Sequence, residues 1–236
     1  MHDDTHNHEI HSDEHGHHHD DDDGHHHDPY VEDYFLGETI DVEQLSPSLI
    51  RVVLKIAGGE RLIPSGHADE WVRLALRPDP DTAVTLPVLM ENGKWGRPDG
   101  SQHCPNRPYT VRRWDASRCE MTIDIVVHEG GVAAGWAMSA KVGDVVGICN
   151  PEGRLWIPKG STWILMPPVI TGLPAAGRVF EELPEGSLAL VPGHVPLGED
   201  QQAIATTADA SRHCHVCHGL KPDLPVSTAQ PRLAAS

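Results

Sequence analysis

The sequence predicts a mainly β protein, in which an antiparallel barrel is followed by a truncated α/β segment. Two observations lead to this fold class. Short β-prone runs recur between turn residues from Thr39 to Ile157, which is typical of an antiparallel barrel. Beyond residue 160 a single strand–helix–strand pattern follows, which is fewer repeats than a complete doubly wound nucleotide domain needs.

The predicted barrel begins with a hairpin, because apolar residues alternate on both sides of a Ser46-Pro47-Ser48 turn between Thr39 and Ile56. A strand at Trp71–Leu76 is closed by prolines, and a loop rich in Gly, Pro and Asn spans residues 91–106. Four further strands are predicted at Tyr109–Trp114, Glu120–His128, Asp144–Cys149 and Arg154–Ile157. One helix is predicted between Val132 and Ala140.

The α/β segment contains one predicted βαβ unit, with a strand at Trp163–Met166, a helix at Leu173–Leu183 and a strand at Ser187–Val191. After Pro192 the apolar pattern fades. We therefore expect a low-complexity tail at 1–28, the barrel at 29–160, a partial α/β region at 161–205, and a divergent, unstructured tail at 206–236.

The N-terminal 28 residues hold ten acidic residues, no Lys or Arg, and eleven of the 18 histidines of the chain. Such a composition cannot bury a core, so we expect disorder unless a metal organises the segment. Imidazole and carboxylate groups are ligands for zinc, nickel, copper or iron. The candidate metal ligands are the two triplets His17, His18, His19 and His25, His26, His27.

The charge of the chain argues against some classes of binding partner. Its net charge is −17, and the part after residue 28 is also acidic, which argues against a nucleic acid or an anionic membrane surface. No apolar run is long enough to cross a bilayer, and the N-terminus does not resemble a secretory signal. Five cysteines lack the spacing of a disulfide framework. We therefore predict a cytoplasmic protein with reduced thiols and a small-molecule ligand.

The strongest local signal is the stretch Arg107–Asp115, Arg-Pro-Tyr-Thr-Val-Arg-Arg-Trp-Asp, followed by the strand Met121–His128. Here the sequence resembles the siderophore-interacting proteins, a family of FAD-dependent ferric-siderophore reductases whose barrel carries an Arg-x-Tyr-Thr-x-Arg segment. The resemblance runs in order from about Gln44 to Leu183. It includes Pro64-Ser65-Gly66, Glu70–Leu74, Ala133–Ala137 and Val142-Gly143-Asp144.

The resemblance implies a Greek-key FAD-binding barrel with no catalytic residue beyond the flavin, a ferric siderophore as substrate, and NAD(P)H or ferredoxin as electron donor. Tyr109 would stack on the isoalloxazine ring, and the Thr110 hydroxyl would hydrogen-bond near N5. Arg107 or Arg112 would bind the pyrophosphate, and the N–H groups after Gly131 would bind a phosphate. The implied flavin-binding residues are Arg107, Pro108, Tyr109, Thr110, Arg112, Asp124, Val126, His128, Gly131, Ala133 and Trp136.

The α/β segment departs from the family pattern. Pro167-Pro168-Val169 stands where family members have an Ala-Gly-Asp turn, so two N–H donors and a carboxylate are missing. A Trp-x-His-Arg-like segment is not found after Val191. We therefore expect NAD(P)H to dock poorly.

Two alternatives stay open. The run from Cys214 to His218 matches the Cys-x-x-Cys-His pattern of c-type haem attachment, but without an export signal zinc or iron bound by Cys214 and Cys217 is the better interpretation, beside an unliganded tail. The chain could also be a non-enzymatic metal-binding protein, with a degenerate flavin barrel and a metal-buffering His-rich tail. A flavin spectrum would separate that class from a reductase.

Overall fold

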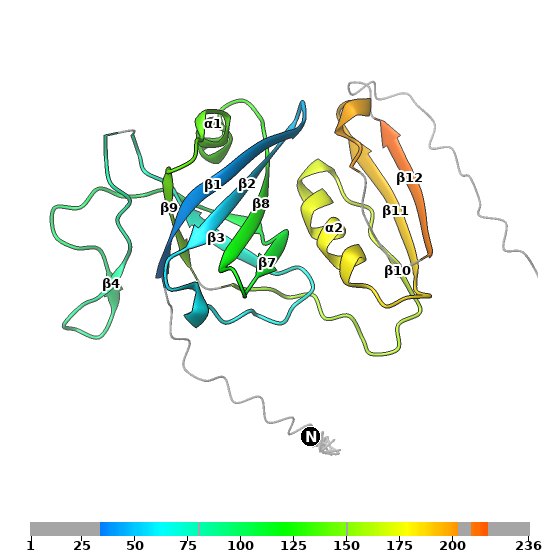
Figure 1. Cartoon of the computed structure of the whole chain (residues 1–236), viewed down its shortest axis with the longest axis horizontal. Helices are drawn as coiled ribbons and strands as arrows, with labels where there is room; N and C mark the ends of the chain where they lie inside the picture. The colour runs from blue at the N-terminus through cyan, green and yellow to red at the C-terminus, as the bar shows by residue number, and fades with distance from the viewer. Residues whose placement is uncertain (1–33, 80, 150, 203–208, 217–236) are drawn as a thin grey trace, which may run out of the picture. The chain divides into compact units, whose positions relative to one another are not determined.

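A computed structural model describes residues 34–79, 81–149, 151–202 and 209–216 of the chain. They form an antiparallel barrel followed by an α/β layer, both of which are seen in Figure 1. The predicted fold class is therefore confirmed. The predicted tail of residues 1–28 lies outside the described residues.

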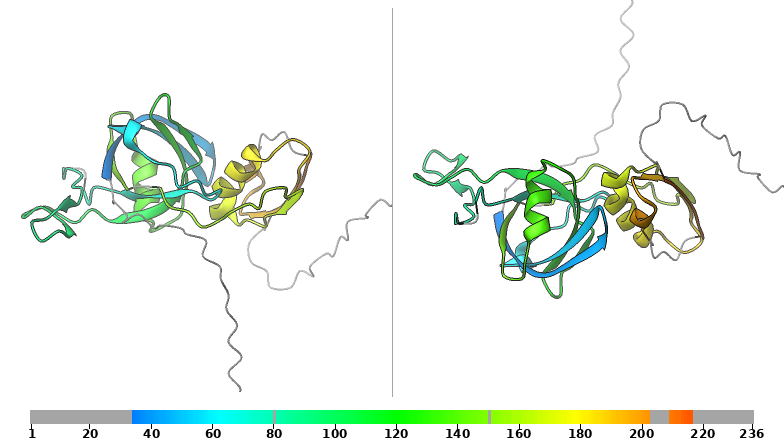
Figure 2. Two further views of the ribbon diagram at one scale, coloured as in Figure 1. Left: turned by 90° about the horizontal axis from the view of Figure 1, so that it is seen from below. Right: turned by 90° about the horizontal axis from the view of Figure 1, so that it is seen from above.

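The barrel is built from seven strands of the described chain. They are β1 (Tyr34–Ser46), β2 (Leu49–Ile56), β3 (Trp71–Ala75), β6 (Asn106–Thr110), β7 (Arg113–Asp115), β8 (Glu120–Val126) and β9 (Val145–Cys149). Their order in the antiparallel sheet is β6-β3-β9-β1-β2-β8-β7, and β6 also contacts β8. The sheet therefore curls until β6 meets β8, and Figure 2 shows the barrel along its axis.

Alternating apolar side chains fill the barrel. In β2 the side chains of Val52, Leu54 and Ile56 are buried, whereas the residues between them are more exposed. The same period places Ile123 and Ile125 of β8 in this core. The strands predicted at Trp71–Leu76, Glu120–His128 and Asp144–Cys149 are thus found as β3, β8 and β9.

Helix α1 (Val132–Ser139) covers one end of the barrel, as the views of Figure 2 show. Its side chains Ala133 and Ala137 are buried in the barrel core. Because these side chains are small, the helix backbone can lie close to the sheet. The helix predicted between Val132 and Ala140 is confirmed.

The predicted hairpin of β1 and β2 is also confirmed, and Asp200 of the short turn η3 (Gly198–Asp200) binds its tip. One oxygen of the carboxylate accepts hydrogen bonds from Ser46 Oγ at 2.7 Å and Ser48 N at 3.0 Å. Burial alone would raise the pKa of Asp200, but the bonds from Ser46 and Ser48 outweigh it and the pKa is lowered. The chain near residue 200 is thus attached to the barrel.

The single strand predicted over Tyr109–Trp114 is interrupted at Val111 and Arg112. The Val111 N–H donates to the carbonyl oxygen of Glu70 at 2.9 Å, and the Arg112 N–H donates to that of Thr122 at 2.9 Å. These two residues carry the chain from its ladder with β3 to its ladder with β8. The predicted strand is therefore two strands, β6 and β7.

Two other barrel predictions are wrong. The strand predicted at Arg154–Ile157 does not form, because the N–H groups of residues 154 and 155 donate to the Asp69 carboxylate at 2.9 and 2.8 Å instead of to a ladder. The loop predicted at 91–106 includes β5 (Trp95–Gly96), which pairs with β4 (Val88–Leu89). A further short helical turn, η1 (Gly59–Arg61), follows β2.

The α/β layer consists of β10 (Trp163–Leu165), a turn η2 (Ile170–Gly172), α2 (Leu173–Glu182), β11 (Leu188–Val195) and β12 (Asp209–Val216). Its strands are parallel and follow one another in the order β10-β11-β12. Helix α2 packs Ala176 and Phe180 against Ala189 of β11. In the part of the chain that the structure describes, no helix has the length and apolarity needed to cross a membrane.

Strand β12 corrects part of the unstructured tail predicted at 206–236. It pairs with β11 from Leu188↔Asp209 to Val195↔Val216. Ladder bonds join backbone groups and do not require apolar side chains, so the polar run Asp-Ala-Ser-Arg-His-Cys-His-Val carries little of the periodicity by which strands are found. The rest of that tail lies outside the described residues.

Candidate functional site

Strand β6 presents Tyr109 at the surface of the barrel. Tyr109 lies opposite Val72 of β3, is half-buried, and packs against the barrel core. Burial raises the pKa of its hydroxyl, while the nearby positive charge of Arg107 acts in the opposite direction. Residues two apart on a strand share a face, so Arg107 and Tyr109 form one candidate surface.

The neighbours of Tyr109 have unused hydrogen-bonding groups. Arg107 and Pro108 are exposed, and the Arg107 guanidinium donates to the carbonyl oxygen of Asn106 at 2.7 Å. Within the described ranges no carboxylate pairs with Arg107, and the Thr110 hydroxyl has no hydrogen bond. This short strand therefore carries an aromatic ring and a cation on one face, and a hydroxyl without a partner at the next position.

The N-terminus of α1 also lacks partners. Its N-cap residue is Gly131, no side chain caps the helix, and no acidic residue lies in the first turn. The first helical hydrogen bond is donated by Gly135 N to the carbonyl oxygen of Gly131 at 2.8 Å. The N–H groups of residues 132–134 therefore remain for an anion.

Three other predicted residues lie at or in this helix. The exposed His128 ring rests against Gly131, where an added Cβ would lie 2.5 Å from His128 Cε1, so a side chain there would push the ring aside. The buried indole N–H of Trp136 has no acceptor among the described residues. Ala133 is buried in the core and can offer only backbone.

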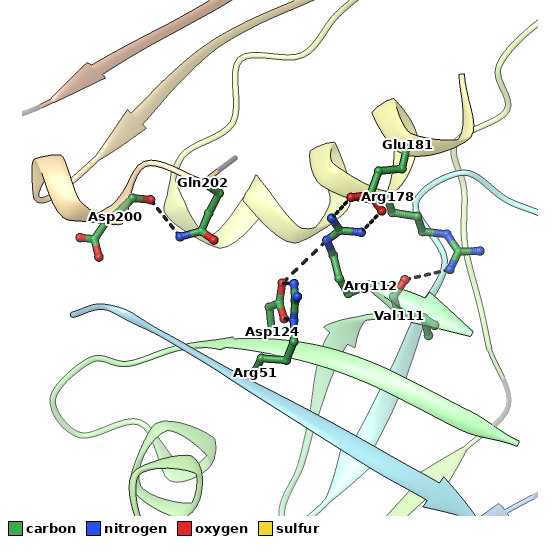
Figure 3. Close-up of polar contacts among 8 residues, drawn as sticks. All are labelled: Arg51, Val111, Arg112, Asp124, Arg178, Glu181, Asp200 and Gln202. Atoms are coloured by element: carbon green, nitrogen blue, oxygen red, sulfur yellow. Dashed lines mark hydrogen bonds and ion pairs between the residues drawn. The ribbon is translucent and has the colours of Figure 1, made fainter. Parts of the chain in front are cut away.

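Asp124, Arg112 and Val126 lie elsewhere, beside α2. Arg51 binds Asp124 through two hydrogen bonds of 2.7 and 2.8 Å, and Arg112 binds Glu181 through two of 2.6 and 2.5 Å. Figure 3 shows this chain of charges, which Arg112 Nε completes at 3.8 Å from Asp124. Val126 packs in the small apolar cluster formed with α2.

The charges of this network are mutually satisfied. The hydrogen bonds from Arg112 hold the pKa of Glu181 below its usual range against the effect of burial. The hydrogen bond to Asp124 raises the pKa of Arg51. A cavity of about 270 Å³ beside it is lined by both arginines, Asp124, Glu181 and apolar residues of β2 and α2. Since Arg112 is already bonded to carboxylates, Arg107 is the better candidate for a phosphate.

Sequence reasoning missed Arg51, Glu181 and the arginine of α2, Arg178. Arg178 donates to the carbonyl oxygen of Val111 at 2.8 Å and lies 3.3 Å from the Glu70 carboxylate. No spacing along the chain signals these contacts. They join segments that are adjacent only in the folded protein.

The candidate metal ligands are not placed in a site. The two His triplets and Cys217 lie outside the described residues, and Cys214 is described only as a backbone position in β12. Over the described residues, no group of three or more His, Cys, Asp or Glu is arranged to hold a metal. Cys104, Cys119 and Cys149 are free thiols.

Tyr109, Arg107 and the start of α1 each suit a part of a flavin dinucleotide. The half-exposed ring of Tyr109 can carry a flat ring system, and the Arg107 guanidinium and the uncapped start of α1 can both carry phosphate. The unpartnered indole N–H of Trp136 leaves a donor for an acceptor atom.

Comparison with known proteins identifies a family for the barrel. The family described as the siderophore-interacting FAD-binding domain matches residues 38–155, half of the chain. The NADPH-dependent ferric-chelate reductase of Escherichia coli (strain K12) is 37% identical over 145 residues, which are 60% of this chain and 54% of that protein. Ferric vibriobactin reductase ViuB of Vibrio cholerae is 30% identical over 165 residues, which are 68% of this chain and 58% of that protein.

One solved structure is matched over a larger share of its own length than the two reductases. The crystal structure of a siderophore utilization protein from T. fusca superimposes with a TM-score of 0.65 and 30% identity, over 78% of this chain and 69% of that one. The chain spans little more than half the length of the two reductases. The family model covers half of the chain, and the chain belongs to the siderophore-interacting FAD-binding domain family.

Proposed function

We propose that this protein binds FAD and is a flavin-dependent ferric-siderophore reductase. The observation that carries the proposal is the pairing, on β6, of the half-exposed Tyr109 ring with the unpaired cation of Arg107. Two relatives are named as a ferric-chelate reductase and a ferric vibriobactin reductase, which supports the same activity here.

Each residue of the site has a separate task. Tyr109 supports one face of the isoalloxazine ring, and the Thr110 hydroxyl, beside it on the strand, is free to hydrogen-bond the ring edge. Arg107 and the free N–H groups of α1 neutralise the pyrophosphate. His128 lies beside the start of that helix, and Trp136 offers its indole N–H from within it. These groups bind and orient, and none exchanges electrons.

The bound FAD would supply the electron transfer to iron. A siderophore holds ferric iron through hard oxygen ligands, and the ferrous ion is held less firmly, so reduction releases it. No covalent catalysis by a side chain is needed. The electron donor, NAD(P)H or ferredoxin, and a cytoplasmic location stay predictions.

The first test is cofactor binding. FAD added to the purified protein is expected to bind with quenched fluorescence and more tightly than FMN, because FMN lacks the pyrophosphate and adenosine that Arg107 and α1 would hold. Dithionite-reduced protein should then convert ferric hydroxamate, catecholate or citrate complexes to ferrous iron, trapped by a ferrous-specific chelator. Colourless protein that binds neither flavin would exclude the reductase.

A separate proposal concerns the N-terminal tail, which we infer binds divalent metal through its eleven histidines. Deleting residues 1–28 is expected to remove most zinc or nickel binding and to leave FAD binding intact, because the segment lacks the composition of a core. Calorimetric titration of both proteins with each metal measures this. Equal stoichiometry before and after the deletion would move attention to Cys214 and Cys217.

A further inference from the structure

Helix α2 contacts Val111 and Arg112, the two-residue link between β7 and the proposed flavin strand β6. Val111 comes directly after Thr110 and is fully buried. Its N–H donates to the Glu70 carbonyl oxygen at 2.9 Å, and its own carbonyl oxygen accepts from Arg178 of α2 at 2.8 Å. The backbone next to the flavin strand is therefore fixed from one side by the barrel and from the other by α2.

The second residue of the link, Arg112, is held in the same way. Its backbone N–H donates to the carbonyl oxygen of Thr122 in β8. Its two terminal side-chain nitrogens both donate hydrogen bonds to the Glu181 carboxylate of α2. The guanidinium lies against the helix backbone at Gly177, where an added Cβ would be 2.9 Å from Arg112 Nε. Only glycine at residue 177 allows this approach.

The contacts are reciprocal. Arg112 of the barrel pairs with the Glu181 carboxylate of α2. Arg178 of α2 lies 3.3 Å from the Glu70 carboxylate of the barrel. Glu70 is only 1% exposed and is also bound by Ser65, so it is a rigid anchor. Figure 3 shows Arg112 reaching Glu181 of the helix and Arg178 reaching the backbone of Val111. When one member of an ion pair is removed and the other is buried, the protein loses stability, because the remaining charge is left without a partner.

We propose that FAD binding on β6 and docking of α2 are energetically coupled through Val111 and Arg112, with Glu181 and Arg178 as positioning residues. This inference rests on the proposed FAD binding. Docking of α2 fixes the backbone that follows Thr110 and so keeps Tyr109 and Thr110 in their binding orientation. By linkage, FAD must in turn stabilise the docked helix by the same factor.

The test compares two adjacent glutamates of α2. Glu181→Gln removes the charge that binds Arg112, whereas Glu182→Gln, the matched control, alters an exposed carboxylate whose one ion pair among the described residues is with Arg178 of the same helix, at 3.6 Å. FAD titration gives the affinity of each protein. Amide hydrogen exchange of residues 173–182, with and without FAD, measures docking of the helix.

In the wild type, FAD is expected to slow exchange in α2. Glu181→Gln should raise the Kd for FAD by about threefold to thirtyfold, reduce the protection that FAD confers on α2, and change the visible circular dichroism of the flavin. Glu182→Gln should match the wild type in all three. Arg178→Met provides a second variant, and it should weaken FAD binding in the same direction.

Wild-type affinity and wild-type protection in Glu181→Gln and Arg178→Met would overturn the coupling while leaving FAD binding established. An equal loss in Glu182→Gln would also overturn it, since the effect would then belong to the general charge of the helix. Failure of the wild type to bind FAD would overturn the proposed function itself and the coupling with it.

Discussion

NADH and NADPH are expected to reduce the bound flavin only very slowly, whereas dithionite should reduce it completely. Hydride transfer needs the nicotinamide held against the flavin, and such positioning contributes about 7–11 kcal/mol to a reaction barrier. A chain that does not hold the nucleotide should therefore react slower by a factor on the order of 10⁵ or more.

The strand order and the prolines of the α/β layer are the reasons to expect slow reduction by NADH and NADPH. Nucleotides bind open α/β sheets where the strand order reverses, and the described strands run in simple succession, β10-β11-β12. The turn after β10 contains Pro167 and Pro168, and α2 has Pro174 in its first turn, so three N–H donors are missing where a phosphate would bind. Leu173, at the start of α2, is buried in an apolar cluster.

The measurement is anaerobic stopped-flow absorbance in the flavin band. NADH, NADPH, reduced ferredoxin and dithionite are compared on one preparation loaded with FAD. The dithionite trace is the control that shows a reducible flavin. Fast bleaching that saturates with either nucleotide would contradict the prediction and show that the α/β layer docks the nucleotide in spite of its simple strand order.

Replacing Tyr109 with Ala is expected to raise the Kd for FAD about tenfold to hundredfold. A ring stacked on the flavin contributes about 1.5–3 kcal/mol through buried area and ring–ring attraction, and each factor of ten corresponds to about 1.4 kcal/mol. The barrel should stay folded, because Tyr109 is only half-buried at a sheet edge and its loss costs about 1–3 kcal/mol of stability.

Tyr109→Phe is the matched control, since it keeps the ring and removes only the hydroxyl. Its affinity for FAD should stay within about twofold of the wild type. Fluorescence titration gives the Kd values, and thermal unfolding of the apoproteins separates weak binding from unfolding. Unchanged affinity in Tyr109→Ala would mean that the isoalloxazine ring lies elsewhere on the barrel.

Several elements could be predicted from the sequence because local signals encode them. The alternation in β2 and β8 identified both strands, and the small apolar residues of α1 identified its helix. The motif around Tyr109 led to the family, which the comparisons confirm. Arg107, Pro108, Tyr109 and Thr110 share one strand for the same reason, since neighbours in sequence remain neighbours in a strand.

Other features had no local signal. The strand β12 is polar, and the interruption at Val111 depends on which strand supplies the partner. Arg112 was predicted to bind the pyrophosphate because of its place in a motif. In the structure its guanidinium pairs with Asp124 and Glu181 instead.

The sequence by itself determined the β-rich class of the fold, the membership of the family and the strand that carries the candidate flavin platform. Only the tertiary structure decided which arginine is free for a phosphate and which one fastens α2 to the barrel. Arg112 and Glu181 are 69 residues apart in the chain. A contact over that separation follows from how the barrel and the helix pack, and neither hydrophobic period nor motif spacing records such packing.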